Sequence, residues 1–131
     1  MRLVVDASVT VQVCLAEAGF GLLADHELTA PVLLRFEVLS VLHEAQWHER
    51  ISPDLARTAR DRLLTAPVSL SRDVQLSARA WDVGDRLGWA KTYDAEYVAL
   101  AAAEDLPLLT IDRRLARGAA RLVRTMGPED L

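Results

Sequence analysis

Residues 2–8 read Arg-Leu-Val-Val-Asp-Ala-Ser, a short apolar run that ends at an acid. The central Leu-Val-Val favours a buried strand, because β-branched residues fit a pleated, half-buried surface. From Ser8 the apolar spacing becomes helical, and Ser8 is predicted to be the N-cap of this helix. The stretch therefore predicts a strand that passes directly into a helix, with Asp6 at the carboxyl end of the strand.

Strand and helix patterns alternate along almost all of the remaining chain. Further strands are predicted at residues 27–30, 68–70, 107–112 and 122–124, and helices at residues 32–50, 53–65, 73–87 and 93–103, with a short arginine-rich helix after Asp112. Ser52 and Thr92 are predicted N-caps, and Gly88 a helix C-terminus. Such alternation favours the α/β class, with three layers (α/β/α) and a central, mainly parallel sheet.

Length and composition fit one folded domain over residues 1–131. Apolar residues make up 51% of the chain and charged residues 26%, a balance that excludes a disordered protein. The longest apolar stretch, near residues 97–103, is far shorter than the roughly 20 residues of a membrane helix. Asp6 halts the apolar run that a secretory signal would continue. We therefore expect a cytoplasmic protein without a membrane partner.

The charge and cysteine content restrict the kinds of ligand. The formal net charge of -4 argues against binding nucleic acid by general basic attraction. However, five arginines and no acid lie between Arg113 and Arg124, so a nucleic-acid partner is compatible if acids and arginines occupy separate places. Cys14 is the only cysteine, which excludes an internal disulfide and a Cys-rich zinc site.

Asp6 and Asp112 hold equivalent positions, because each ends a predicted apolar strand. Open α/β sheets bind ligands just outside the carboxyl ends of their strands, so both acids are expected at one crevice. An aspartate at such a place also serves as an ordinary turn or helix-entry residue, and the sequence leaves that alternative open.

Glu37 and Asp94 are acids on predicted helix faces that are otherwise apolar. Glu37 is in line with the predicted core-facing stripe of its helix, which comprises Leu34, Val38, Val41 and Ala45. Asp94 shares its face with Tyr97, Val98 and Ala101. A carboxylate in such surroundings is costly unless it is paired or bound to a metal. The alternatives are that Glu37 reaches water or Arg35, and that Asp94 is a first-turn acid favoured by the helix dipole.

If the side chains of Asp6, Glu37, Asp94 and Asp112 meet, they form one cluster of negative charge. Charges about 4 Å apart repel by roughly 4 kcal/mol per pair at an effective dielectric near 20, so such a cluster needs a cation. Ligands that are all carboxylate oxygens favour magnesium or manganese over zinc. Two such ions can activate a water molecule and stabilise the leaving oxygen of a phosphodiester. The residues alone therefore predict metal-assisted phosphate chemistry.

Four stretches in this order resemble the PIN domain, and in particular the VapC toxins. They are Leu-Val-Val-Asp6-Ala-Ser8, the helical Glu37, Thr92-Tyr-Asp94-Ala-Glu-Tyr-Val-Ala-Leu-Ala101 and Leu-Leu-Thr110-Ile-Asp112. The resemblance spans essentially the whole chain. It implies an endoribonuclease in which the four acids bind Mg²⁺ or Mn²⁺ and catalyse RNA hydrolysis.

The resemblance also implies supporting residues and partners. Thr110 would support the acidic cluster from its strand, and Ser8 would lie beside the first acid. Many members carry a further acid two residues after the fourth acid and then an aromatic residue, where this chain has Arg114 and Leu115. The number of metal ions is therefore left open. The implied partners are a second copy of the chain, forming a homodimer, and a cognate antitoxin.

Lys91, Arg113 and Arg114 flank Asp94 and Asp112 in the sequence. An acidic pocket alone would repel phosphate, so these three basic residues are predicted to guide the RNA backbone.

Other functional classes lack their residues. His43 and His48 are one residue too far apart for a zinc-protease pair, and there is no Gly-rich phosphate loop or Gly-x-Ser-x-Gly elbow. Asp6-Ala-Ser8 lacks the second aspartate of haloacid-dehalogenase-like phosphatases. The remaining alternatives are a magnesium-dependent phosphoryl-transfer domain and a catalytically silent PIN-like module that binds RNA or protein. All four acidic positions are filled, which favours the nuclease.

Overall fold

The first strand of the chain lies at the centre of the sheet. In a computed structural model, which describes residues 1–131, β1 (Arg2–Val5) pairs with β2 (Glu27–Pro31) and β4 (Leu108–Leu109). With β3 (Val68–Ser71) and β5 (Thr125–Met126) the strand order is β3-β2-β1-β4-β5. Every pairing is parallel, and the three apolar residues of β1 are buried, as expected for a strand covered on both faces.

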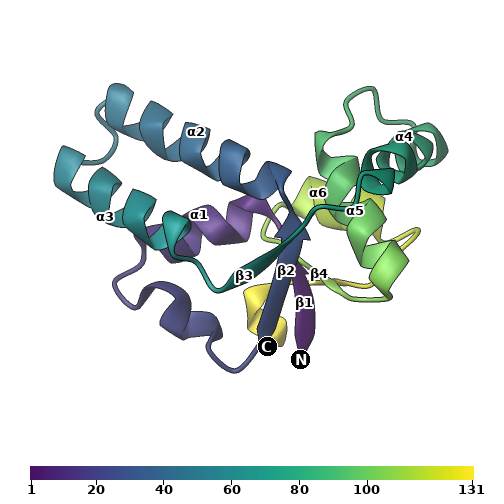
Figure 1. Cartoon of the computed structure of the whole chain (residues 1–131), viewed down its shortest axis with the longest axis horizontal. Helices are drawn as coiled ribbons and strands as arrows, with labels where there is room; N and C mark the ends of the chain where they lie inside the picture. The colour runs from purple at the N-terminus through teal and green to yellow at the C-terminus, as the bar shows by residue number, and fades with distance from the viewer.

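Helices cover both faces of this sheet. They are α1 (Ala7–Leu15), α2 (Leu33–Trp47), α3 (Pro53–Leu64), α4 (Gln75–Leu87), α5 (Tyr93–Glu104) and α6 (Arg113–Ala119), with two short 3-10 segments, η1 (Gly19–Leu23) and η2 (Pro128–Asp130), that the sequence did not predict. Figure 1 shows α1, α2 and α3 on one side of the sheet and α4, α5 and α6 on the other. The predicted three-layer α/β/α fold is confirmed. None of the helices has the length and apolar character needed to cross a membrane.

The strand order places a ligand crevice between β1 and β4. The chain adds β2 and β3 on one side of β1 and then returns to add β4 and β5 on the other side. The connection that follows β1 therefore runs toward β2, and the connection that follows β4 runs in the opposite direction, toward β5. This reversal is the point at which open α/β sheets bind their ligands. Asp6 follows β1 and Asp112 follows β4 at this point.

The start of α1 differs from the prediction. The helix begins at Ala7, and its N-cap is Asp6, whose carboxylate accepts a hydrogen bond from the backbone N–H of Val9. The prediction of Ser8 as the cap is wrong because Ser8 is already helical and its hydroxyl donates to Asp6 instead. Asp6 thus ends the strand and begins the helix, which fixes its carboxylate at the crevice.

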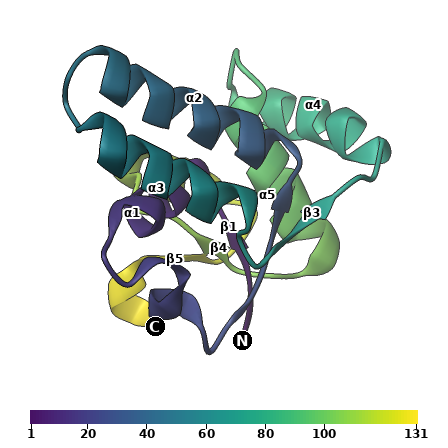
Figure 2. The same ribbon diagram turned by 60° about the vertical axis from the view of Figure 1, so that its left-hand side comes forward.

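The buried face of α2 also differs from the predicted stripe. It comprises Leu34, Val38 and Leu42, whereas Val41 is 42% exposed. Figure 2 shows α2 and α3 side by side, and residues of the two helices are in contact. The buried face of α2 therefore points partly toward α3 and not only toward the sheet, which explains the difference. The helix ends at Trp47, before a left-handed residue at Glu49, rather than at Arg50.

Thr92 occupies the predicted N-cap position of α5, which begins at Tyr93, but its side chain makes no capping hydrogen bond. The last strand is β5 rather than residues 122–124, because the N–H groups of Leu122 and Val123 donate to the carbonyl of Ala119 and close the end of α6. Pairing with β4 starts only at the carbonyl of Arg124.

Candidate active site

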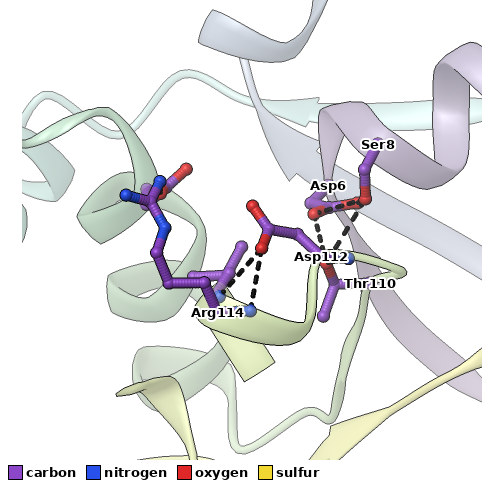
Figure 3. Close-up of polar contacts among 7 residues, drawn as sticks. Asp6, Ser8, Thr110, Asp112 and Arg114 are labelled. Carbon is purple, nitrogen blue, oxygen red and sulfur yellow. Dashed lines mark hydrogen bonds and ion pairs between the residues drawn. The ribbon is translucent and has the colours of Figure 1, made fainter. Parts of the chain in front are cut away.

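Asp6 is held by a small network of hydroxyl groups at the ends of β1 and β4 (Figure 3). The Ser8 hydroxyl lies 2.7 Å from Oδ1 and 2.9 Å from Oδ2 of Asp6, and the Thr110 hydroxyl donates to Oδ2. The N–H of Val9 donates to Oδ1 at 3.0 Å. Asp6 is only 3% exposed, so these donors replace the water that its carboxylate has lost.

Ser8 and Thr110 also join the two strand ends to each other. Their hydroxyl oxygens lie 3.3 Å apart, and each accepts a hydrogen bond from the loop after β4. Ile111 N–H donates to Ser8, and Asp112 N–H donates to Thr110. The turn that carries Asp112 is therefore attached directly to the network around Asp6.

Asp112 is the N-cap of α6. Its Oδ1 accepts from the N–H groups of Arg114 and Leu115, at 2.9 Å and 3.1 Å. Its Oδ2 accepts no hydrogen bond from the chain, and Figure 3 shows this oxygen on the side of the carboxylate away from the capping contacts. Asp112 thus both stabilises α6 and presents one oxygen to the crevice.

Glu37 enters the site from α2 and is held by Tyr97 of α5. The Tyr97 hydroxyl donates to Oε1 of Glu37 at 2.6 Å. Tyr97 is fully buried, and burial raises the pKa of its hydroxyl, which therefore remains a donor. The prediction for Glu37 named Arg35 or water as the alternative partner and missed this tyrosine. The spacing of Tyr97 three residues after Asp94 was the available signal, because it places both side chains on one face of α5.

Asp94 lies in the first turn of α5 and has one basic neighbour. The Arg114 guanidinium approaches its Oδ2 at 4.0 Å, with the Arg114 side chain 84% exposed. An ion pair this long and this exposed is weak. Asp94 itself is half-buried, and this weak ion pair leaves most of its negative charge without a partner in the chain.

The four carboxylates share one electrostatic environment. Burial is the main cause that raises the pKa of Asp6, Glu37 and Asp94. The charge of Asp112 further raises the pKa of Asp6 and of Asp94, and the charges of Asp94 and Asp6 further raise that of Glu37. Each of the four acids thus interacts electrostatically with at least one of the others, so they form one connected group.

A raised pKa predicts how stability should depend on pH without added metal. The folded protein binds a proton at Asp94 more tightly than the unfolded chain does. Its charge therefore costs stability, and this cost grows as the pH rises from the ordinary aspartate value, about 4, through the raised folded value. In EDTA, the midpoint of thermal unfolding of Asp94→Asn should rise relative to that of the unmodified chain over this range. A gap that narrows with rising pH would contradict the assignment.

A divalent cation fits the chemistry of this donor set but is not fully accommodated by its present geometry. Carboxylate oxygens suit a divalent cation, which would relieve the repulsion between the negative charges at this site. However, no three acidic, histidine or cysteine side chains lie close enough in the structure to form a metal-binding group. Each oxygen of Asp6 also accepts two hydrogen bonds. Metal ligation by Asp6 would require the Ser8 hydroxyl, which both oxygens share, to turn away.

Two of the three predicted basic residues lie beside the acids. Lys91 and Arg114 line a cavity of about 580 Å³ together with Glu37 and Asp94. Arg113 is exposed at the start of α6 and does not line this cavity. Acids and basic residues thus share one cavity here, instead of the separate places that the sequence analysis named as the condition for a nucleic-acid partner.

Comparison with known proteins identifies the family. The PIN domain matches residues 3–121, which includes all four acids and both supporting hydroxyl groups. The chain belongs to the PIN-domain family. This PIN domain is 39% identical over 119 residues to Ribonuclease VapC1 of Mycobacterium tuberculosis, covering 86% of this chain and 87% of that protein. It is 35% identical over 121 residues to Ribonuclease VapC3 of the same organism, covering 88% and 86%.

Solved structures show the same fold. PAE2754 from Pyrobaculum aerophilum superposes with a TM-score of 0.78 at 23% identity, covering 99% of this PIN domain and 94% of that chain. VapBC-1 from nontypeable Haemophilus influenzae gives a TM-score of 0.61 at 16% identity, covering 98% and 99%. The predicted resemblance to VapC-type PIN ribonucleases is confirmed by the family match and by the two VapC relatives.

Proposed function

We propose that this PIN domain is a Mg²⁺- or Mn²⁺-dependent endoribonuclease and the toxin of a toxin–antitoxin pair. One observation carries the proposal: four carboxylates from four separate elements gather at the reversal point of the sheet, where their negative charges add to burial in raising the pKa of Asp6, Glu37 and Asp94. A stable fold does not need such repulsion. The similarity to VapC ribonucleases favours RNA over other phosphate substrates.

Asp6, Glu37, Asp94 and Asp112 are the residues that would hold the cation. Mg²⁺ or Mn²⁺, when bound, supplies activation of a water molecule and stabilisation of the leaving oxygen. The residues of the chain itself hold the carboxylate oxygens of the site in position. Asp112 presents a free oxygen, while Tyr97 fixes Glu37.

The test is cleavage of total cellular RNA by the purified chain, with and without EDTA, followed by mapping of the cut ends. We expect cleavage at defined positions that stops in EDTA and returns when excess Mg²⁺ or Mn²⁺ is added. Cleavage that persists in EDTA would exclude the metal mechanism. Binding of RNA without cleavage under all metal conditions would favour the silent PIN-like module.

Lys91, Arg113 and Arg114 are expected to bind phosphates of the RNA backbone. Their replacement by alanine together should weaken RNA binding and reduce its salt dependence, because each lost phosphate contact lowers the slope of log affinity against log salt by about 0.7 for a single strand. Arg57 and Arg60 on α3 provide a control pair away from the crevice. An unchanged slope in the triple variant would place the RNA backbone elsewhere.

A further inference from the structure

The cavity beside the acids offers more than a place for a cation. Its lining combines the acids Glu37 and Asp94, the basic residues Lys91 and Arg114, and the aromatic residues Trp89 and Tyr93. Its volume of about 580 Å³ lies within the roughly 300–1,000 Å³ of pockets that hold organic ligands. We propose that this cavity binds one nucleotide of single-stranded RNA, adjacent to the phosphate that is cut. This inference rests on the ribonuclease function proposed above.

Arg114 is placed to exchange its partner for a phosphate. Its contact with Asp94 is long, at 4.0 Å, and its side chain is largely exposed. Releasing such a contact costs little, whereas a guanidinium binds phosphate oxygens in a bidentate manner. Lys91 adds a second positive charge to the same cavity. A phosphate next to the one at the acids would therefore be attracted here.

Tyr93 provides a surface for the base. It is 57% exposed at the start of α5, directly before Asp94, and it lines both this cavity and a neighbouring one near the start of α2. An exposed aromatic ring beside two positive charges suits a nucleobase, whose flat face stacks on it. Bases in a duplex have both faces covered by their neighbours, so the occupant is a single strand.

The width of the cavity depends on a contact between Trp89 and Gly118. A Cβ atom built on Gly118 would lie only 2.6 Å from Cζ2 of Trp89, so the indole ring touches the backbone of α6. Trp89 belongs to the loop between α4 and α5, which also carries Lys91. Arg114 lies four residues before Gly118, on the same face of α6. The absent side chain at Gly118 thus sets the distance between the two elements that carry the basic residues.

The test uses a short fluorescein-labelled single-stranded RNA of mixed sequence, bound in EDTA so that intact RNA can be verified on a gel. We expect Tyr93→Leu to weaken binding roughly tenfold, the size of one lost stacking contact. Gly118→Ala should also weaken binding, because its added Cβ would push Trp89 away from α6 and change the width of the cavity. Trp47→Leu removes an exposed aromatic ring on α2, and Gly21→Ala adds a Cβ in open space. Both controls should bind as the unmodified chain does.

Two further measurements separate the causes. Heparin, a polyanion without bases, should bind Tyr93→Leu as well as the unmodified chain. In a Trp47→Phe, Trp81→Phe variant, Trp89 is the remaining tryptophan, and its emission should be quenched by the single-stranded RNA but not by the same RNA annealed to its complement. Full RNA affinity in Tyr93→Leu, or an equal loss for heparin, would overturn the nucleotide site. Tight binding with these features but no cleavage in Mg²⁺ would instead contradict the ribonuclease function.

Discussion

Asp6→Asn should lower the rate of RNA cleavage by about a thousandfold or more while the protein stays folded. The amide keeps the shape of the carboxylate but lacks the charge that holds the cation, and a metal ion contributes several kcal/mol of transition-state stabilisation. One amide oxygen can still accept from Val9 N–H and cap α1. The Ser8 and Thr110 hydroxyl groups can turn to accept from the new NH₂ group. The measurement is single-turnover cleavage, with circular dichroism to verify folding.

Asp94→Asn and Asp112→Asn should show the same loss, because each acid comes from a different element of the same site. Asp54→Asn is the matched control, since Asp54 is an exposed acid in the first turn of α3, away from the crevice. Normal folding with full activity in Asp6→Asn would remove Asp6 from the site. A loss of activity in Asp54→Asn would indicate a general effect of charge.

Expression of this chain alone is expected to arrest growth of the host cell, and co-expression of the neighbouring open reading frame should restore it. A ribonuclease with a complete acidic site harms the cell that makes it, so its activity has to be suppressed. An acidic pocket is best filled by an arginine, which pairs bidentately with carboxylates and displaces the metal. We therefore expect the partner to insert an arginine among Asp6, Glu37, Asp94 and Asp112.

The structure also offers an apolar surface for such a partner. The exposed side chains of α2 include Phe36, Leu39, Val41 and Trp47. A cavity of about 290 Å³ lies between α2 and α3 next to Leu39, and an amphipathic segment of the partner would pack there. An arginine-to-alanine scan of the partner, read out by growth, should find one residue that inhibition requires. If the chain is harmless alone, the toxin function fails, and if no arginine matters, the arginine mechanism fails.

Local sequence patterns were sufficient for the order of strands and helices and for placing Asp6 and Asp112 at one edge of the sheet, but not for the bounds of the last two strands. An acid at the end of each of two apolar strands predicted that Asp6 and Asp112 would share a crevice, because parallel strands have their carboxyl ends at one edge. The choice between Asp6 and Ser8 as helix cap was not predictable in this way. Both residue types cap helices well, and only the backbone conformation at the strand end decides between them.

Local sequence patterns did not predict the contacts between segments that are distant in the chain. Tyr97 and Glu37 are 60 residues apart. The face that Tyr97 shares with Asp94 indicates that its hydroxyl lies near the acids, but neither helix alone indicates that its partner is Glu37. The same holds for Trp89 and Gly118, because a glycine inside a helix reads only as a weak helix former. Such pairs depend on how the helices pack, which the order of apolar residues along one helix does not specify.

The pairing of β1 with β4 also determines when, during synthesis of the chain, the proposed active site becomes complete. Ser8 and Thr110 meet across 102 residues of chain, and Asp112 follows only after β4. During translation the N-terminal segments leave the ribosome first, so Asp6 lacks its neighbours from β4 until that strand has been made. A nascent or prematurely ended chain lacking β4 would have neither Thr110 nor Asp112 at the site. On the ribonuclease function proposed above, an inhibitor of this chain would be needed only after β4 has been made.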